Sequence, residues 1–192
     1  MIIEKYIFIS GIPASGKSYL AQKIAKDFEM MHVDVDDWRE EMTKDINIKR
    51  WVNFFFDKDE KKYWQNTTCE KHWQNLVKQS EAFWEVIIRK INKIIEDDKS
   101  SLFEGVNILP HLAAKDLKFP GIFLLGESFE TILERNKKNP RWSKVEFLQR
   151  KEAEIFFNCE RPRYKSEAEK YGFKTFIDSV EAEKELIRLI KN

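Results

Sequence analysis

The sequence predicts an α/β fold in which a parallel β-sheet is covered by helices on both faces. Short apolar runs that suit buried strands alternate along the chain with longer segments of helical spacing, which is typical of a parallel sheet. The motif GIPASGKS occupies residues 11–18, between the first apolar run and the first helical segment. A length of 192 residues is typical of one domain, so we expect residues 1–192 to fold as a single unit with its own core.

The motif at residues 11–18 fits the phosphate-binding pattern G-x-x-x-x-G-K-[ST] at every position. An apolar run at residues 6–9 precedes it and residues 19–26 follow it with helical spacing, so a strand, a glycine-rich loop and a helix stand in the order that such a site needs. In this arrangement the backbone N–H groups of the loop and the helix N-terminus surround the phosphates of a nucleotide. The residues that we expect to bind the nucleotide are Gly11, Ala14, Ser15, Gly16, Lys17, Ser18 and Tyr19.

Two side chains of this loop are expected to act on the phosphates. Lys17 would bridge the β- and γ-phosphate oxygens as a catalytic residue, and the Ser18 hydroxyl would hold Mg²⁺. The alternative is a chance glycine turn before an ordinary helix, which the agreement of motif and context disfavours. The loop therefore predicts the binding of ATP or GTP.

Composition and charge argue against several other classes of protein. Lys and Arg total 34 and Asp and Glu total 33, so the net charge of +1 gives the chain no overall attraction to nucleic acid, although a local basic patch stays open. No apolar run approaches the length of about 18 residues that a membrane span needs. The first strand begins so close to Met1 that we expect no signal peptide. Cys69 and Cys159 lie far apart without the spacing of a metal site, and we expect reduced thiols in a cytoplasmic protein.

The second strand is predicted at residues 31–35 and is followed by the acidic pair Asp36 and Asp37. Carboxylates at the C-terminal end of a strand beside a phosphate loop lie where open α/β sheets bind their ligands. We choose Asp36 as the catalytic residue that reaches a substrate hydroxyl. Asp37 has an alternative role as the cap of a helix that begins at Trp38, and Asp34 is expected to lie along the strand.

The middle of the chain is rich in aromatic residues, above all at residues 51–56. Two interpretations of this segment stay open, a helix packed on the body of the protein and the lining of a substrate pocket. Asp59 is expected to cap one long helix that ends at residues 97–100. A mainly apolar stripe that faces the core recurs along this helix at steps of three and four, namely Trp73, Leu76, Val77, Ser80, Phe83, Trp84, Ile87, Ile88, Ile91, Ile94 and Ile95.

The rest of the chain continues the alternation of strands and helices. Further strands are predicted at residues 101–104, 121–125 and 173–177. Helices are predicted at residues 111–117, 127–138 and 180–190. Another helix is expected to begin at Ser143, because Glu146 stands three residues later and completes the pattern of a capping box.

A basic segment follows the fourth predicted strand. Arg135 and Arg141 flank a break at residues 139–140, and the neighbouring cations are Lys137, Lys138, Lys144 and Arg150. Phosphoryl transfer depends on positioning and on positive charge, and a mobile basic lid supplies both when it closes. We expect a lid at about residues 135–163, in which Arg135 and Arg141 act as catalytic residues that reach the phosphates only when both substrates are bound. The alternative for each cation is a solvated helix face.

The order of GIPASGKS, VDVDDWR and LFEGVNILP resembles that in the P-loop kinases of the nucleoside-monophosphate-kinase type. The resemblance is greatest to the branch that holds 2-phosphoglycerate kinase, the 5′-hydroxyl polynucleotide kinases, the zeta toxins and chloramphenicol phosphotransferase. It covers residues 1–39 and about 76–112 well, and the remainder in general layout. It implies a three-layer α/β/α P-loop NTPase fold with a five-stranded parallel sheet of order 2-3-1-4-5. We expect residues 40–98 to form a helical insertion on the substrate side.

The resemblance also implies roles for residues outside the loop. Asp36 matches an Asp that activates the hydroxyl in polynucleotide kinases, and Arg39 matches an Arg that assists it. Glu104, at the end of the third strand, takes the Mg²⁺ or water-orienting role of a Walker B carboxylate, with a cap of the next turn as the alternative. Gln79 and Asn107 belong to the substrate side. 2-Phosphoglycerate kinase commonly has His at the position of Asn107, whereas Asn is nearer to the polynucleotide kinases, so the acceptor stays open.

We therefore expect an ATP- and Mg²⁺-dependent phosphotransferase whose acceptor is a hydroxyl of a small metabolite, phosphorylated or not. ATP is favoured because no motif for guanine is present. One alternative is a kinase of 5′-hydroxyls in polynucleotides or nucleosides, which needs a basic groove leading to Asp36. Another is a regulatory ATP-binding module that uses residues 51–56 as an exposed apolar contact. We expect no membrane partner and do not favour nucleic acid.

Overall fold

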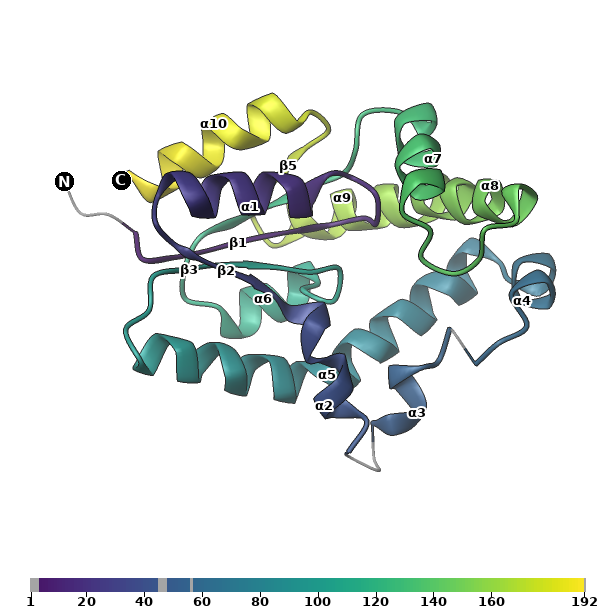
Figure 1. Ribbon diagram of the computed structural model, residues 1–192, viewed down its shortest axis with the longest axis horizontal. Coiled ribbons are helices and arrows are strands. Elements are labelled where there is room, and N and C mark those ends of the chain that lie inside the picture. Colours follow the sequence, from purple (N-terminus) through teal and green to yellow (C-terminus); the bar gives the residue numbers. More distant parts are fainter. Residues whose placement is uncertain (1–3, 45–47, 56, 192) are drawn as a thin grey trace.

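A sheet of five parallel strands lies at the centre of the molecule (Figure 1). The computed structural model describes residues 4–44, 48–55 and 57–191, so Phe56 of the aromatic segment lies outside the described residues. The strands are β1 (Tyr6–Gly11), β2 (Met31–Asp34), β3 (Ser101–Glu104), β4 (Gly121–Leu124) and β5 (Lys174–Phe176). Their order across the sheet is β2-β3-β1-β4-β5, which confirms the order predicted from the sequence.

The register of the strands brings their C-terminal ends to one edge of the sheet. Ile9 of β1 and Asp34 of β2 both lie beside Glu104, the last residue of β3. Gly11, the last residue of β1, lies beside Leu124, the last residue of β4. The loops that follow these strands therefore stand next to one another, at the edge where open α/β sheets bind ligands.

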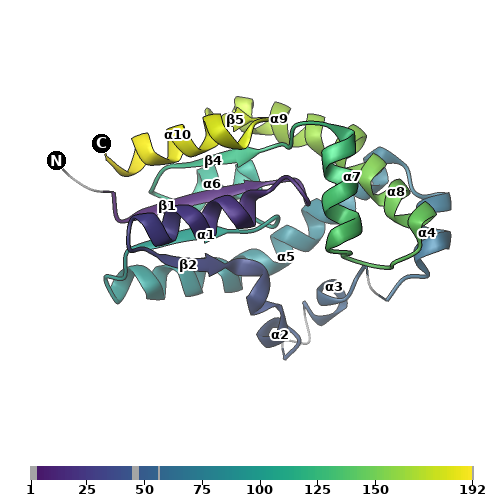
Figure 2. The same cartoon turned by 45° about the horizontal axis from the view of Figure 1, so that its top comes forward.

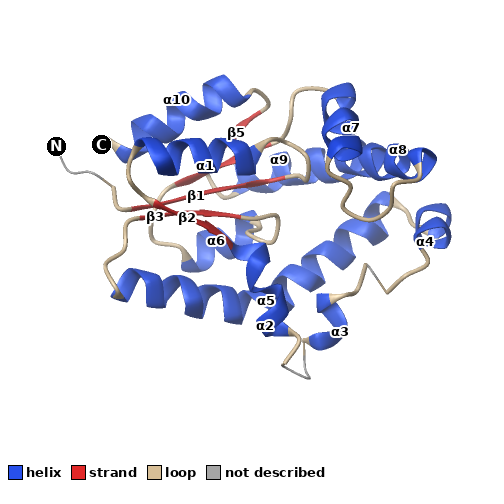
Figure 3. Ribbon diagram, viewed as in Figure 1, coloured by secondary structure: helices blue, strands red, loops and turns tan. Residues whose placement is uncertain are grey.

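Two helices cover one face of the sheet. α1 (Lys17–Asp27) and α10 (Ser179–Ile190) lie side by side there (Figures 1 and 3). Leu20 of α1 packs in a fully buried cluster with Ile7 and Ile9 of β1. Each side chain of this kind contributes roughly 1.5–3 kcal/mol when it is buried, so α1 is held firmly against the strand that precedes the glycine-rich loop.

Three further helices cover the opposite face and complete the third layer. They are α5 (Cys69–Glu96), α6 (Pro110–Asp116) and α9 (Arg161–Lys170). Phe83 of α5 and Tyr164 of α9 belong to the same buried cluster as Phe8 of β1. The apolar stripe predicted along residues 73–95 thus faces the core.

Short helices connect β2 to α5. They are the 3₁₀ turn η1 (Val35–Trp38), α2 (Arg39–Met42), α3 (Lys49–Val52) and α4 (Glu60–Asn66). Figure 2 shows α3 and α4 gathered with α7 and α8 at the end of the molecule opposite the two chain termini. These elements lie beyond the C-terminal edge of the strands, where the loops after β1 and β2 emerge.

The single long helix expected after Asp59 is two helices. Asp59 caps α4, because its Oδ1 accepts a hydrogen bond of 2.8 Å from the Lys62 amide. Thr67 and Thr68 then adopt extended backbone, with ψ angles of 147° and 162°. The Thr68 hydroxyl accepts from the Lys71 amide at 3.2 Å and caps α5. Two adjacent β-branched residues favour extended backbone, and a capping hydroxyl offers the new helix its start.

In the region after β4, one helix begins later than the sequence predicts. Its elements are α7 (Phe129–Lys138), α8 (Glu146–Ile155) and the π-helical turn η2 (Phe156–Glu160), which leads into α9. The capping box expected at Ser143 does not form, because Val145 occupies the N-cap position of α8. The Ser143 hydroxyl instead accepts a hydrogen bond of 3.3 Å from the Val145 amide. Such a local side-chain bond stabilises a turn in place of a helical start.

The expectation of two separate reduced thiols is wrong. Cys69, the first residue of α5, and Cys159, in η2, form a disulfide with their Cα atoms 5.0 Å apart. Their separation of 90 residues in the sequence gave no sign of this proximity, because α5 and η2 meet only in the folded chain. Disulfides are uncommon in cytosolic proteins, so the cysteines no longer support the cytoplasmic location expected above. Among the residues that the structure describes, no helix is both long and apolar enough to cross a membrane.

Candidate active site

The glycine-rich loop runs from the end of β1 to the first turn of α1, as its motif predicts. Gly11 has a φ of 132°, and a Cβ there would lie 2.0 Å from the Leu124 carbonyl oxygen, so only glycine fits. Gly16 has a φ of 100° and stands at the N-cap of α1, where no side chain caps the helix. Ala14 also has a positive φ, of 57°. Backbone of this kind turns successive N–H groups toward one point and makes an anion-binding concavity.

Two buried groups of the loop suit a phosphate ligand. Lys17 is only 6% exposed, and burial lowers the pKa of its ammonium although the charge of Glu104 opposes that shift. Ser15 Oγ is buried and makes no hydrogen bond with the described residues. A buried cation and an orphaned hydroxyl both gain from an anion that supplies charge and oxygen acceptors. The side chain of Tyr19, in contrast, is exposed, so its part in nucleotide binding would come from the backbone or from the ring's outer face.

Ser18 and Glu104 lie together at the end of the loop. The Ser18 hydroxyl donates a hydrogen bond of 3.0 Å to Glu104 Oε2, and His32 Nε2 lies 3.3 Å from Oε1 of the same carboxylate. Burial raises the pKa of Glu104, but the bond from His32 and the charge of Lys17 outweigh burial and leave the pKa lowered. A hydroxyl and an ionised carboxylate are the hard oxygen ligands that Mg²⁺ prefers. Within the described ranges, no group of three or more His, Cys, Asp or Glu side chains could hold a metal ion by itself.

The acidic residues after β2 have separate roles. Asp34, not Asp37, caps the turn η1, because its Oδ1 accepts a hydrogen bond of 2.8 Å from the Asp36 amide. Burial, with the charges of Asp36 and Glu104, raises the pKa of Asp34 to about 6. Asp36 Oδ1 is buried without a hydrogen-bond partner among the described residues, and Asp37 is exposed. Asp36 therefore has a buried acceptor without a hydrogen bond, and its charge acts on Lys17 of the phosphate loop.

Glycine after β3 makes room for this acidic turn. A Cβ at Gly105 would lie 2.4 Å from Val35 Cγ2 and 3.6 Å from Asp36 Oδ1. The first distance is shorter than any real contact, so a larger residue would push η1 away from the sheet. The glycine of the LFEGVNILP segment thus positions Asp36 beside the end of β3.

The expected substrate-side residues form a connected polar group. Arg39 donates to Asn107 Oδ1 at 3.4 Å, and Asn107 donates to the Ser80 hydroxyl at 2.9 Å. Burial lowers the pKa of Arg39 below its usual value, and the charge of Asp36 opposes this shift. Gln79 lies nearby on α5, but its amide donates to the Trp51 carbonyl at 2.7 Å. That bond ties α5 to the end of α3, so Gln79 has a structural contact beside any role toward a substrate.

The two arginines proposed for the lid lie in different places. Arg135 already contacts the phosphate loop, because its Nη1 donates to the carbonyl oxygens of Ser15 at 2.6 Å and Ala14 at 3.4 Å. Arg135 thus already lies against the loop, and the expectation that it reaches the phosphates when both substrates are bound stays a prediction. The carbonyls of the loop, which face away from an anion, attract this guanidinium without a ligand. Arg141 is exposed and lies on the segment between α7 and α8.

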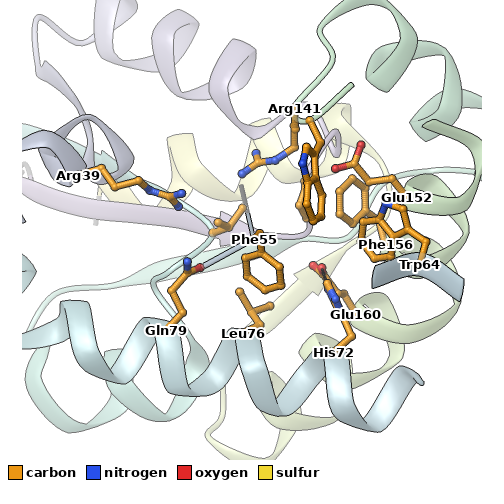
Figure 4. A pocket seen from close by; sticks show the side chains of 13 residues that line it. Arg39, Phe55, Trp64, His72, Leu76, Gln79, Arg141, Glu152, Phe156 and Glu160 are labelled. Atoms are coloured by element: carbon orange, nitrogen blue, oxygen red, sulfur yellow. Dashed lines mark hydrogen bonds and ion pairs between the residues drawn. The ribbon is translucent and has the colours of Figure 1, made fainter. Parts of the chain in front are cut away.

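A cavity opens beside the phosphate loop and connects these groups (Figure 4). Figure 4 shows Arg39 and Gln79 at one side of it and Trp64, Glu152 and Glu160 at the other. Its lining comes from the loop, from α2, α4 and α5 with the segment before α4, from the turn after β3, and from the region between α7 and η2. The lining residues are Pro13, Arg39, Phe55, Trp64, His72, Leu76, Gln79, Val106, Arg141, Trp142, Glu152, Phe156 and Glu160. Phe55 supports the pocket-lining interpretation of the aromatic segment, whereas the buried Val52 supports packing on the body.

The far side of this cavity holds residues that sequence reasoning missed. Tyr63 Oη lies 2.9 Å from His72 Nδ1, and His72 Nε2 lies 2.8 Å from Glu160 Oε1, so three side chains form one hydrogen-bonded row. Burial raises the pKa of the nearby Glu152 to about 7. The aromatic density of residues 51–64 was a usable signal for this region. No local pattern, however, marks the acids of α8 and η2 as inward-facing.

Comparison with known proteins supports the fold alone. No protein-family model matches the sequence, and no curated protein matches it. The shikimate kinase of Acinetobacter baumannii, solved with shikimate, shares 15% identity over 97% of this chain and 92% of its own, with a TM-score of 0.55. TT1252 of Thermus thermophilus shares 14% identity over 95% and 94%, with a TM-score of 0.50. The deoxyadenosine kinase of M. mycoides with bound dATP shares 15% identity over 97% and 99%, with a TM-score of 0.49. The first two likenesses and the strand order show a three-layer α/β/α P-loop fold.

Proposed function

We propose that this protein is an ATP- and Mg²⁺-dependent kinase that phosphorylates a hydroxyl of a small molecule bound in the cavity beside the phosphate loop. We assign it to the nucleoside-monophosphate-kinase-like P-loop kinases, near the branch named above. One observation carries the proposal: Pro13 of the loop lines the same cavity as Arg39 and Arg141. A nucleotide on the loop would therefore direct its terminal phosphate toward the bound acceptor.

Each part of the loop has a defined task in this proposal. Gly11, Gly16 and the buried Lys17 would hold the phosphates, and Ser18 with Glu104 would hold Mg²⁺. When bound, Mg²⁺-ATP supplies the transferable phosphoryl group and part of the charge that offsets its negative oxygens.

The residues of the chain supply positioning and proton transfer on the acceptor side. The orphaned oxygen of Asp36 accepts the proton of the acceptor hydroxyl. Arg39, oriented by its bond to Asn107, and Arg141 provide the positive charge at the point of transfer. Arg135 fixes the loop by holding the carbonyls of Ala14 and Ser15.

The region of residues 135–163 acts in this proposal as a lid, and the segment between α7 and α8 is its moving part. Arg141 and Trp142 lie on that segment and line the cavity. Closure over the acceptor would exclude water, which otherwise competes as an acceptor for the phosphoryl group. Arg39 of α2 and Gln79 of α5 line the cavity on the side away from Trp142, and Gln79 belongs to the insertion proposed at residues 40–98.

A polynucleotide acceptor is not favoured. The cavity ends at Glu152 and Glu160, two buried carboxyl groups that would repel the phosphodiester backbone of a longer chain. A regulatory module that binds partners through residues 51–56 is also not favoured. Of the part of this segment that the structure describes, Val52 is buried and Trp51, Phe54 and Phe55 are partly buried.

The proposal is tested by supplying ATP, Mg²⁺ and a panel of small alcohols, sugars and phosphorylated alcohols and following transfer of the γ-phosphoryl group. We expect one chemical class to be phosphorylated by the natural protein and not by Lys17→Ala. Binding of ATP with no transfer to any acceptor in the panel would count against a kinase.

A further inference from the structure

The half of the cavity that lies away from the phosphate loop is acidic. Glu152 of α8 and Glu160 of η2 both line it, and they are only 4% and 2% exposed. Figure 4 shows both side chains turned toward the cavity, across from Arg39. Glu60 adds a third buried carboxyl group behind this wall, where it accepts from Trp64 Nε1 at 3.3 Å. Three acids gathered in a poorly solvated place are costly to keep ionised without positive charge.

The protein itself supplies little of that positive charge. Glu160 Oε1 accepts from His72, and Glu152 Oε2 accepts a hydrogen bond of 2.8 Å from the Asn136 amide. Within the described part of the chain, no Lys or Arg forms an ion pair with either carboxyl group, and Arg141 acts on Glu152 only at longer range. Glu160 Oε2 is buried without any hydrogen-bond partner in the described chain. An unpaired carboxylate oxygen at a cavity wall is the group that a ligand's donor would satisfy.

Aromatic rings enclose the same half of the cavity. The Trp64 ring lies 5.5 Å from that of Trp142 at an interplanar angle of 68°, and 5.6 Å from the imidazole of His72. The Phe55 ring lies 5.5 Å from His72 on another side. The faces of Trp and Phe rings attract organic cations, and they do so most strongly where water is excluded. Carboxylates combined with aromatic walls therefore favour a positively charged nitrogen over a neutral or anionic group.

From this arrangement we infer that the acceptor is a hydroxylated amine, a small alcohol that carries a positively charged nitrogen. The inference rests on the proposed kinase function and names its substrate class. The ammonium lies between Glu160 and the aromatic rings, and the hydroxyl points to Asp36 and Arg39. On transfer, the bond from the γ-phosphorus to the bridging β-phosphate oxygen breaks and a bond to the acceptor oxygen forms. The hydroxyl proton passes to the Asp36 carboxylate, and ADP and the phosphate ester of the amino alcohol leave.

The charge distribution of the cavity supports this orientation. Arg39 and Arg141 stand at the side of the phosphates, and the carboxyl groups stand at the far side. Burial holds the pKa of Glu152 at about 7, so a cation that binds beside it would stabilise its ionised form. An acceptor with the reverse orientation would place its ammonium against two arginines.

The test uses pairs of alcohols that match in shape and differ in charge. Glucosamine is compared with glucose, and choline with neohexyl alcohol, in which carbon replaces the quaternary nitrogen. Binding to the full-length protein with a non-hydrolysable ATP analogue is followed by calorimetry, and phosphorylation is followed with ATP. We expect the charged member of at least one pair to bind about tenfold or more tightly, which corresponds to about 1.4 kcal/mol.

A neutral variant tests the residue that carries the inference. Glu160→Gln keeps the acceptor for His72 and removes the charge, so it should abolish the preference for the amine. Glu154→Gln is the matched control, because Glu154 lies on α8 and pairs with Lys151 outside the cavity lining. If Glu160→Gln does not fold, Glu152→Gln replaces it, because burial raises the pKa of Glu152 to about 7 and the folded protein therefore holds this carboxyl group only partly ionised at neutral pH. That variant should lower the preference severalfold.

The outcomes separate this inference from the proposed function. Equal binding of both members of every pair, binding of neither, or a preference for the neutral alcohol would overturn the inference. Phosphorylation of neutral alcohols would do so while leaving the kinase function in place. Selective binding of amines with no phosphoryl transfer to any acceptor would instead overturn the kinase function and leave the cation site standing.

Discussion

The role of Asp36 can be tested by Asp36→Asn, which keeps the size of the side chain and removes its charge. Asp36 Oδ1 is buried and makes no hydrogen bond with the described residues, so the substitution breaks no hydrogen bond of this oxygen. Asp34, not Asp36, caps η1 through its bond to the Asp36 amide, which the substitution leaves intact. The variant should therefore fold with a melting temperature within a few degrees of the natural protein.

The size of the kinetic effect follows from the loss of a general base. An asparagine cannot take the hydroxyl proton. A general base commonly raises the rate by a factor of about 10² to 10⁴, which corresponds to about 2.7–5.4 kcal/mol of activation free energy. ATP binding should behave differently. The charge of Asp36 acts on both Lys17 and Arg39, so its removal leaves a more positive site for the nucleotide. ATP affinity should stay the same or rise slightly.

The assay measures calorimetric ATP titration and product formation on the same preparation. Asp37→Asn is the matched control, because Asp37 is the exposed neighbour on the same turn and should leave both quantities unchanged. Parallel loss of ATP binding and turnover in Asp36→Asn would show that Asp36 is a structural or metal-site residue. Unchanged turnover would remove it from the mechanism.

Four further outcomes are expected. Lys17→Ala should lower turnover about a hundredfold or more, about 3 kcal/mol, because preorganised charge at the phosphates is lost, and natural turnover with any accepted substrate would contradict this assignment. Amide exchange at residues 135–145 should slow more with a bisubstrate analogue than with ADP. Arg141→Ala should lower turnover more than it lowers ATP affinity. Equal protection of these amides with and without ligand would exclude a closing lid. Reduction of the disulfide, which closes a loop of 90 residues, should lower the free energy of unfolding by about 4–5 kcal/mol in urea titrations, and an unchanged midpoint would refute this. Glu152 has its pKa raised from 4.5 to about 7 by burial, so its contribution to stability is present below pH 4.5 and is lost as the pH rises through 7. Glu152→Gln should remove roughly 3 kcal/mol of that pH dependence, and a profile identical to that of the natural protein would contradict the argument.

The sequence predicted the sheet because its information is local. The three central strands are short, mostly apolar runs, and the predicted strand at residues 101–104 matches β3. The loop at residues 11–18 could be predicted for the same reason, since glycine at fixed positions reports a backbone that other residues cannot adopt. The break at Thr67 and Thr68 was missed because the apolar stripe begins only at Trp73, and the residues before it carry no helical period.

The acidic half of the cavity could not be predicted in this way. His72 and Glu160 stand 88 residues apart and meet only because α5 packs against η2. Trp64 lies on α4 and Trp142 lies between α7 and α8, far apart in the sequence, and their rings meet at the same cavity. A buried Glu on a charged helix has the same local pattern as a solvated one. The choice of Asp36, in contrast, followed from the rule that parallel strands bring their C-terminal ends to one edge.

The disulfide constrains which part of the cavity wall can move. Cys69 lies one helical turn before His72, and Cys159 directly precedes Glu160, so the covalent bond joins the two elements that supply this hydrogen-bonded pair. If the proposed lid closes by moving the segment between α7 and α8, the disulfide confines that movement to residues ahead of Cys159, where the π-helical turn that begins at Phe156 already interrupts the regular helical bonding. In the proposed kinase, the surface formed by His72 and Glu160 would stay fixed while the segment between α7 and α8 moves. An acceptor would then meet the charge of this fixed surface before the proposed lid encloses it.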